Sequence, residues 1–532
     1  MKPITRFSAY SELTLTSQLM KEPSFHLREL WKDEKRQDRF LWTGAGICLD
    51  AARQRIDEIV LDQLLKLALE CGVIEKFADM ANGEIVNKTE GRPALHMASR
   101  MPKDQSLFVN GVDVAKEFAD TRNQIARFAE EVHTGKMVGS TKKKFQHVVV
   151  VGIGGSYLGA AFLYEALLDR AISGIRVHFL PNVDPYNYVR IRQKIDLETT
   201  LWVFVSKSFT TTESLFNIRQ AIADMGKTGL TPGDHIVTVS SKKEDPNVPP
   251  IPQRERFLFH DGIGGRFSAT SAVGILPLAL GLGLDVCDEL IQGAHEMDVH
   301  ALTAPTEENL PLLGALVNVW NNCFFSYEAC AVIPYAEALG LFPLHLQQLS
   351  MESCGKRVNE DGELLQTPSG MILFGTPGTG AQHSFFQMAH QGRSFPIDFI
   401  GVKNPIVPER SIEMNGVTAG QTLFSNLLAQ ANALAFGKKD TNPQTEFDGN
   451  RPSTIITISD LSPRNMGRLL SYYEAKTVME AFVLGINPFD QFGVELGKKM
   501  AGSIYQIFAD INKEPNSKAI IENSPMDVRR YL

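Results

Sequence analysis

A cluster of hydroxyl side chains follows a short apolar run at residues 201–205, which read LWVFV and have the composition of a buried strand. Ser206, Ser208, Thr210 and Thr211 then fall within a short turn, and apolar residues at helical spacing follow it. Such a turn brings free backbone N–H groups, hydroxyl donors and the positive end of a helix dipole to one place. We therefore favour a phosphate-binding turn over the alternative, an ordinary helix cap, which needs only one hydroxyl.

A glycine-rich turn follows a second apolar run. Residues 147–151 are mostly valine and lead into Gly152-Ile153-Gly154-Gly155-Ser156. A dinucleotide fingerprint that opens at Gly152 would need a glycine at position 157, where the chain has Tyr157, so we expect no nucleotide cofactor. The glycines still permit close backbone approach to an anionic or hydroxylated ligand, although a tight turn without a ligand has the same pattern.

Arg266 lies in a third segment of this kind, Gly264-Gly265-Arg266-Phe267-Ser268. A single arginine is usually a solvated surface residue. Here the glycines and hydroxyls on either side favour a cation placed for chemistry.

A phosphate-binding turn and a placed cation are suited to the isomerisation of a sugar phosphate. Moving a carbonyl between adjacent carbons needs a base, such as a carboxylate, that takes a proton from one carbon and returns it to the next. The enediolate intermediate then needs a nearby cation, and a cyclic sugar needs a further acid–base group to open it. The cysteines are scattered and none shows the spacing of a zinc site, so we expect no metal and no cofactor.

Strands, turns and helical patterns alternate along most of the chain, which predicts an α/β fold with parallel sheets covered on both faces. Strands are expected at 177–179, 201–205 and 235–239, and the alternation starts again near residue 309. Both candidate turns follow strands, where ligands of such sheets bind. The predicted organisation is a mainly helical N-terminal segment (1–100), a first α/β domain (101–290), a second (305–511) and a tail (512–532), which either docks or moves freely.

The bulk composition narrows the choice of partners. The chain has 532 residues, 43% hydrophobic and 21% charged, and a net charge of −8, so nothing in it favours nucleic acid or an anionic membrane. The first residues lack a signal-peptide pattern, and no segment reaches the length of a membrane span. We expect a cytoplasmic protein whose partners are small molecules.

The chain resembles the glucose-6-phosphate isomerase (phosphoglucose isomerase) family along most of its length. The matching segments occur in order and at compatible spacing: 87–100, 152–159, 206–214, 264–268, 347–355, 378–392 and 489–498. The resemblance implies a metal-free interconversion of D-glucose 6-phosphate and D-fructose 6-phosphate, in glycolysis and gluconeogenesis, through ring opening and a cis-enediolate. It also implies two doubly wound sugar-isomerase (SIS) domains with helical additions, and a homodimer whose active site is shared across the interface.

The resemblance assigns roles to individual residues. Glu352 matches the base that carries the proton between C1 and C2, and His383 matches the ring-opening histidine, donated by the partner subunit. Lys498 matches the lysine that assists at the ring oxygen and hydroxyls, and Arg266 matches the arginine beside the enediolate. The expected sugar contacts are Gly155, Ser156, Gln348 and Gln491, and the expected phosphate loop comprises Ser206, Lys207, Ser208, Phe209, Thr210 and Thr211.

Some positions depart from the family pattern. The usual Gly-Thr-Asn-Gly-Gln-His run reads GTGAQH at 378–383, and Phe492 stands where tryptophan is usual. Tyr157 and Thr212 also replace commoner residues, but no departure removes a proton-transfer group. Two other functions stay open: a non-catalytic sugar-phosphate-binding regulatory protein, and an isomerase of another hexose phosphate such as mannose 6-phosphate.

Overall fold

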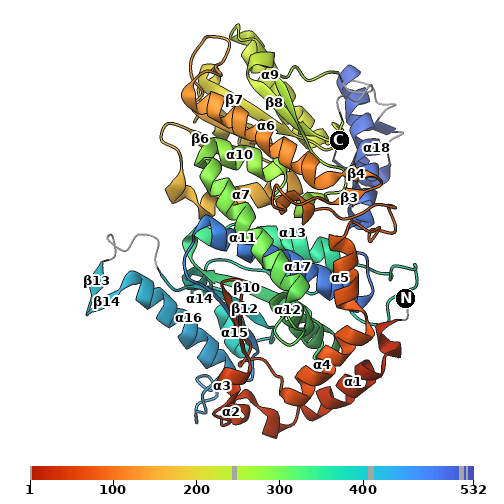
Figure 1. Ribbon diagram of the computed structural model, residues 1–532, viewed down its shortest axis with the longest axis vertical. Coiled ribbons are helices and arrows are strands. Elements are labelled where there is room, and N and C mark those ends of the chain that lie inside the picture. Colours follow the sequence, from red (N-terminus) through yellow and green to blue (C-terminus); the bar gives the residue numbers. More distant parts are fainter. Residues whose placement is uncertain (1–2, 243–248, 405–411, 515–520, 523–524, 532) are drawn as a thin grey trace. The chain divides into compact units, whose positions relative to one another are not determined.

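A computed structural model describes residues 3–242, 249–404, 412–514, 521–522 and 525–531 of the chain (Figure 1). The chain divides into two compact units, Met1–Pro488 and Phe489–Leu532, and each is described by itself. Among the described residues, no helix combines the length and the apolar character needed to cross a membrane.

The first sheet of the larger unit has five parallel strands in the order β6-β5-β7-β8-β9. Its strands are β5 (His147–Val151), β6 (Arg176–Leu180), β7 (Thr200–Val205), β8 (Ile236–Ser240) and β9 (Glu255–Leu258). The strands expected at 177–179, 201–205 and 235–239 are all present, extended or shifted by one or two residues.

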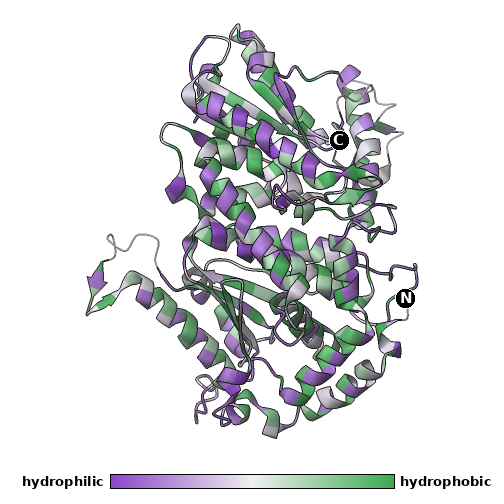
Figure 2. Cartoon of the chain, in the orientation of Figure 1, coloured by the Kyte–Doolittle hydropathy of each residue, from purple (hydrophilic) through white to green (hydrophobic). Residues whose placement is uncertain are grey.

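Helices cover both faces of this sheet, as the valine-rich strands require. On one face, Val149, Trp202 and Phe204 pack against α8 (Pro185–Arg192) and α9 (Thr212–Lys227). The other face carries α6 (Val114–Thr134), α7 (Leu158–Ala166) and α10 (Ala272–Leu282), which pack on one another (Figure 1). The apolar residues of α6 recur at helical spacing and form one buried side, and polar residues lie between them on the other side (Figure 2).

The second sheet has the order β1-β2-β15-β12-β10-β11. The four strands β10 (Ala329–Tyr335), β11 (Ile372–Phe374), β12 (Ile397–Val402) and β15 (Ser453–Ile458) run parallel. The hairpin β1 (Leu41–Gly44) and β2 (Ile47–Asp50) adds an antiparallel edge through the pairing of β2 with β15. The chain is therefore an α/β protein with two predominantly parallel sheets, as predicted.

The hairpin interrupts a segment, 25–80, that the apolar spacing predicts to be helical throughout. Ala45 and Gly46 join the two strands with φ values of 43° and 75°, which matches a tight hairpin turn with both central residues in the left-handed region. Four-residue strands are too short to show a clear alternation of apolar residues. The helix expected from residue 51 begins only at α4 (Glu58–Glu70), because the Asp57 carboxylate caps it by accepting from the Val60 N–H at 2.9 Å.

Helices also cover both faces of the second sheet. One face packs against α14 (Gly378–Gln382), α15 (Phe386–Gln391) and α16 (Ala419–Phe436). The other carries α12 (Leu310–Val319), α13 (Phe342–Cys354) and the long α17 (Pro463–Leu484), which α11 (Leu284–Thr303) also contacts. The remaining elements of this unit are α1 (Ser8–Leu19), α2 (Leu27–Leu30), α3 (Arg36–Arg39), α5 (Val73–Ala81), β3 (Phe108–Val109), β4 (Val112–Asp113), β13 (Glu413–Met414) and β14 (Val417–Thr418).

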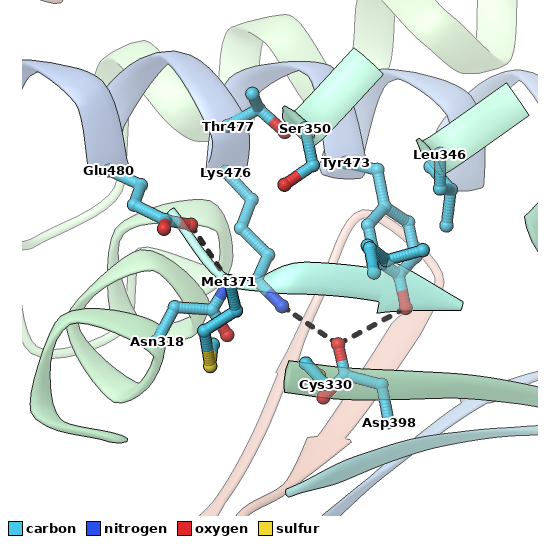
Figure 3. A pocket seen from close by; sticks show the side chains of 11 residues that line it. Asn318, Cys330, Leu346, Ser350, Met371, Asp398, Tyr473, Lys476, Thr477 and Glu480 are labelled. Carbon is cyan, nitrogen blue, oxygen red and sulfur yellow. Dashed lines mark hydrogen bonds and ion pairs between the residues drawn. The ribbon is translucent and has the colours of Figure 1, made fainter. Parts of the chain in front are cut away.

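The central helix α17 brings charged groups into the core beneath α13. Lys476 donates to the Asp398 carboxylate at 2.8 Å, and the Tyr473 hydroxyl lies 3.4 Å from the same carboxylate (Figure 3). Asn318 donates to Glu480 at 2.8 Å, and burial raises the pKa of Glu480. These side chains line a cavity of about 20 Å³.

The C-terminal unit contains α18 (Glu495–Lys513) and α20 (Met526–Arg529). The helix predicted at 493–508 is thus present and extends further. Residues 515–520, 523–524 and 532 of the predicted tail lie outside the described residues, so whether that tail docks is not tested. The domain limits at 101, 290, 305 and 511 also remain predictions.

Candidate functional site

The two turns singled out in the sequence meet at one edge of the first sheet. Strands β5 and β7 pair in parallel, with Val151 opposite Phe204, so residues 152–156 and 206–211 leave neighbouring strands at their carboxyl ends. Ligands bind at this edge in open parallel sheets. Both turns follow strands, as predicted, and the structure shows in addition that these two strands are neighbours.

The 206–211 turn has the geometry of a preformed anion site. Within the described chain, the Ser206 hydroxyl is buried without a hydrogen-bond partner, and Thr211, the N-cap residue of α9, makes no capping bond with its side chain. The hydroxyls of Ser208 and Thr210 lie 2.5 Å apart. Phe209 has φ of 59°, an unfavourable conformation for a bulky residue, and its buried ring packs on Phe204. The turn is thus held in a specific shape, in which the Ser206 hydroxyl lacks a partner among the described residues and Thr211 leaves the start of α9 without a side-chain cap.

Lys207 uses its side chain differently from the hydroxyls around it. Its ammonium donates to the carbonyls of Asp261 and Ile263, at 2.8 and 3.1 Å. Burial, with a smaller contribution from the charge of Arg92, lowers the pKa of Lys207 to about 8.

The glycine turn packs directly on the segment that carries Arg266. A Cβ added at Gly155 would lie 2.1 Å from the carbonyl carbon of Gly265, so only glycine permits this approach of the two backbones. The Ser268 hydroxyl fixes the contact through the carbonyls of Gly155 and Gly265, at 3.2 and 2.7 Å. A Cβ at Gly154 would lie 3.2 Å from Gln348 Nε2, which places the Gln348 amide over the same turn.

Arg266 is buried, and its guanidinium is anchored along one edge. Nε donates to the Ser353 hydroxyl at 2.7 Å, and Nη2 donates to the carbonyl of Pro488. The remaining terminal nitrogen, Nη1, lies 3.4 Å from Glu352 Oε2. The anchored edge fixes the cation, and Nη1 is presented to the carboxylate.

Glu352 lies in the last turn of α13, and its side chain is only 17% exposed. A glutamate on a helix is usually a solvated surface residue, but the low exposure of Glu352 shows that it is not one. Gln348 precedes it by four residues and so faces the same way. Within the described residues, Oε1 of Gln348 is buried and lacks a hydrogen-bond partner, so it is available to a ligand.

His383 stands apart from this cluster within the single chain. It follows α14 and is exposed, and no hydrogen bond or ion pair recorded for the described residues joins it to Glu352 or Arg266. His96, for which the sequence favoured a structural or surface role, is buried and stacks on Phe267 with ring centroids 4.7 Å apart. Burial lowers its pKa, which is typical of a structural histidine.

Gln491 and Lys498 belong to the C-terminal unit. Lys498 lies in the first turn of α18, with Nζ 3.1 Å from Glu495 Oε1, and it is exposed. The larger unit alone therefore brings together Arg266, Glu352, Gln348 and the two turns. His383 also belongs to the larger unit but has no hydrogen bond or ion pair with Glu352 or Arg266 among the described residues, and Gln491 and Lys498 belong to the other unit.

The structure also gives functions to groups that the sequence did not single out. The Ser353 hydroxyl anchors Arg266, and the Pro488 carbonyl does the same. Their only signal in the sequence is that Ser353 lies within the matching segment 347–355 and that Pro488 directly precedes the segment 489–498. Among the described residues, no group of three or more His, Cys, Asp or Glu side chains is arranged to hold a metal ion.

The chain is similar to known proteins along nearly its whole length. A profile of the family described as phosphoglucose isomerase matches residues 50–521. The chain is 48% identical to a glucose-6-phosphate isomerase of Desulfosudis oleivorans, over 99% of this chain and 97% of the relative. It is 39% identical to a cytosolic glucose-6-phosphate isomerase of Arabidopsis thaliana, over 90% and 89% of the two chains. A crystal structure of a glucose-6-phosphate isomerase from Chlamydia trachomatis superimposes with a TM-score of 0.88 at 36% identity, covering 96% of this chain and 97% of that one.

Proposed function

The chain belongs to the phosphoglucose isomerase family, and we propose that it interconverts D-glucose 6-phosphate and D-fructose 6-phosphate. The observation that carries the proposal is the pairing of Glu352 with the Nη1 edge of Arg266, beside two turns suited to a phosphorylated sugar. A base next to a fixed cation is what proton transfer through an enediolate requires.

The phosphate group is bound at the 206–211 turn by backbone N–H groups, by the hydroxyls of Ser206, Ser208, Thr210 and Thr211, and by the start of α9. Gly155, Ser156 and Gln348 contact the sugar hydroxyls, and Gln491 adds a further contact. Binding at these two places fixes the hexose, so that the transfer of a proton between its carbons becomes a step within one complex.

Glu352 removes the proton from C2 of the open-chain aldose and returns it to C1, while the hydroxyl proton moves between the two oxygens. The cis-enediolate formed between the two transfers carries negative charge on oxygen. Arg266 stabilises that charge through Nη1, because its Nε and Nη2 are already engaged with Ser353 and Pro488.

Opening the ring needs a separate acid–base pair. His383 is assigned to it, with Lys498 at the ring oxygen and hydroxyls. The exposed position of His383 in the single chain is consistent with its donation to the active site of a second copy, so we propose a homodimer with shared active sites. We also propose a cytosolic location and a place in glycolysis and gluconeogenesis, since the Arabidopsis thaliana relative is named cytosolic.

A coupled assay on the purified, EDTA-treated protein tests the reaction. We expect fructose 6-phosphate to be converted to glucose 6-phosphate, and Glu352→Gln to lower kcat by at least about a hundredfold, since the catalytic base is lost. Titration calorimetry with fructose 6-phosphate should show that this variant still binds. Glu328→Gln, which changes an exposed glutamate paired with Arg393, is the matched control and should keep full activity.

The same experiment distinguishes glucose-6-phosphate isomerase activity from the two other functions that the sequence leaves open. A regulatory sugar-phosphate-binding protein would bind the ligand without any turnover in the unmodified chain. An isomerase of another hexose would act faster on mannose 6-phosphate than on glucose 6-phosphate when the two are compared at equal concentration. Either result would overturn the proposal.

A further inference from the structure

The ammonium group of Lys207 is held by the backbone of another loop. It donates to the carbonyls of Asp261 and Ile263 at 2.8 and 3.1 Å, and it lies 4.0 Å from the Asp261 carboxylate. It also lies 5.5 Å from the centre of the Phe259 ring, within cation–π range. A lysine with these partners is fixed in place, unlike a solvated lysine on a loop.

The loop that Lys207 holds leads directly to the catalytic cation. Ile263 stands two residues before Gly265, whose backbone packs on Gly155, and three residues before Arg266. A shift of the Ile263 carbonyl would therefore also shift the backbone of the two glycines that follow it, and with it the Arg266 guanidinium, which lies 3.4 Å from Glu352.

Arg92 supports the same loop from another direction. Its Nη1 donates to the Asp261 carbonyl at 3.1 Å, so two cationic side chains share one acceptor. Burial is the main cause that lowers the pKa of Lys207 to about 8, which agrees with an ammonium group whose contacts are mostly with protein atoms and not with water.

We propose that Lys207 is a positioning residue: its ammonium clamps residues 261–263 and so holds Arg266 beside Glu352. The hydroxyls and backbone N–H groups of residues 206–211 then bind the phosphate without the lysine side chain. The inference rests on the proposed function, because it assigns the lysine to the same active site. It refines the expectation that Lys207 belongs to the phosphate loop, because the ammonium group is assigned to the backbone of residues 261–263 and not to the phosphate.

Lys207→Met tests the clamp, because methionine keeps most of the side-chain volume and removes the donors. We expect kcat for fructose 6-phosphate to fall roughly ten- to a hundredfold, as a displaced catalytic group does. KM, and the Kd of inorganic phosphate measured by calorimetry, should change less than about threefold. Lys242→Met removes the same charge from an exposed lysine two residues beyond Ser240, whose hydroxyl bonds the Lys207 carbonyl, and should leave all three values unchanged.

Two results would overturn the clamp. If the Kd of phosphate rises tenfold or more while kcat is retained, the ammonium is a phosphate ligand. If kcat, KM and Kd all stay at the values of the unmodified chain, the contacts to Asp261 and Ile263 have no role in catalysis. The isomerase proposal is tested separately: it fails if the unmodified chain shows no isomerase activity in the same assay.

Arg92→Met gives a second variant if Lys207→Met does not fold. Arg92→Met should lower kcat by a smaller factor than Lys207→Met and should not affect phosphate binding. The decrease in kcat of the double variant should be smaller than the product of the two single decreases, because both side chains act through the Asp261 carbonyl. Amide hydrogen exchange at residues 259–267 needs no turnover. It should become faster in Lys207→Met and not in Lys242→Met, and unchanged exchange would refute the clamp.

Discussion

At the scale of single residues, the roles proposed for Glu352 and Arg266 keep the net charge of the site constant through the reaction. Before proton transfer, the guanidinium faces a carboxylate at 3.4 Å. Afterwards the carboxyl is neutral and the enediolate carries the negative charge instead. Because the cation is anchored through Ser353 and Pro488, it can serve both states without moving, and such preorganised groups lower the barrier most effectively.

The hydroxyls of the 206–211 turn give a prediction of their own. Replacing Ser208 and Thr211 together by alanine should weaken binding of phosphorylated hexoses by about 1–3 kcal/mol, because neutral donors to a charged acceptor are lost. The measurement is KM for fructose 6-phosphate together with the calorimetric Kd of inorganic phosphate. An unchanged KM in the double variant would contradict the assignment of the turn.

Residue chemistry made the hydroxyl turn recognisable, since five Ser and Thr residues in seven positions exceed what a helix cap needs. It did not reveal the partners of Lys207. Those partners are backbone carbonyls more than fifty residues away, and carbonyls carry no mark in a sequence. The same holds for the Pro488 carbonyl that anchors Arg266.

At the scale of elements, α13 packs on α17 and carries Glu352, the carboxylate proposed as the base. Ser350, on α13 beside Met351 and Glu352, lines the same cavity as Lys476 and Asp398 (Figure 3). Removing one partner of such a buried pair costs far more than the pair contributes, because the other charge is left unpaired in the core. We therefore expect Lys476 to add little net stability and to act mainly by keeping the Asp398 carboxylate paired in the core beneath α13.

Lys476→Met should lower the apparent free energy of unfolding by roughly 3–5 kcal/mol, because Asp398 is left as a buried, unpaired carboxylate. Urea unfolding followed by circular dichroism measures this. Adding Asp398→Asn should restore part of the loss, since the amide carries no charge. Lys438→Met breaks an exposed pair with Asp440 and should cost less than about 1 kcal/mol. Equal losses in the two single variants would contradict the role assigned to the buried pair.

Among the strands of the two parallel sheets, β9 includes Glu255 and Arg256 and was not predicted. Most of the others could be predicted from apolar runs, because a strand buried on both faces has few polar positions. The hairpin of β1 and β2 could not. Its strands have four residues each, β1 is partly exposed, and β2 is stabilised by pairing with β15, which follows some four hundred residues later. No local pattern records such a partner.

At the scale of the whole molecule, the larger unit brings Glu352 and Arg266 into contact, whereas no hydrogen bond or ion pair in the described part of the chain joins either of them to His383, the histidine proposed for ring opening. His383 is exposed in the single chain. In a two-fold dimer, a residue that reaches the partner's site from one subunit is matched by the same residue reaching back. Each site would then combine Glu352 of one copy with the histidine of the other.

Mixing two inactive variants tests this arrangement. Glu352→Gln and His383→Ala subunits should each be nearly inactive alone, whereas a mixed dimer contains one site with an intact Glu352 and an intact His383. Co-expression in equal amounts should restore about one quarter of the activity, because half of the dimers are mixed and one site in each is intact. Differently tagged subunits, purified in sequence over two affinity columns, isolate the mixed dimer for the assay.

The matched control is a mixed dimer of two differently tagged Glu352→Gln subunits, which should stay inactive and so excludes recovery caused by the tags. If the mixed dimer of the two variants forms but remains inactive, each site takes its histidine from its own chain. If no dimer can be isolated while the unmodified chain is active, the histidine must also come from within the chain. Recovery of activity requires that a proton-transfer group cross the interface, because no rearrangement within either variant can replace the side chain that it lacks.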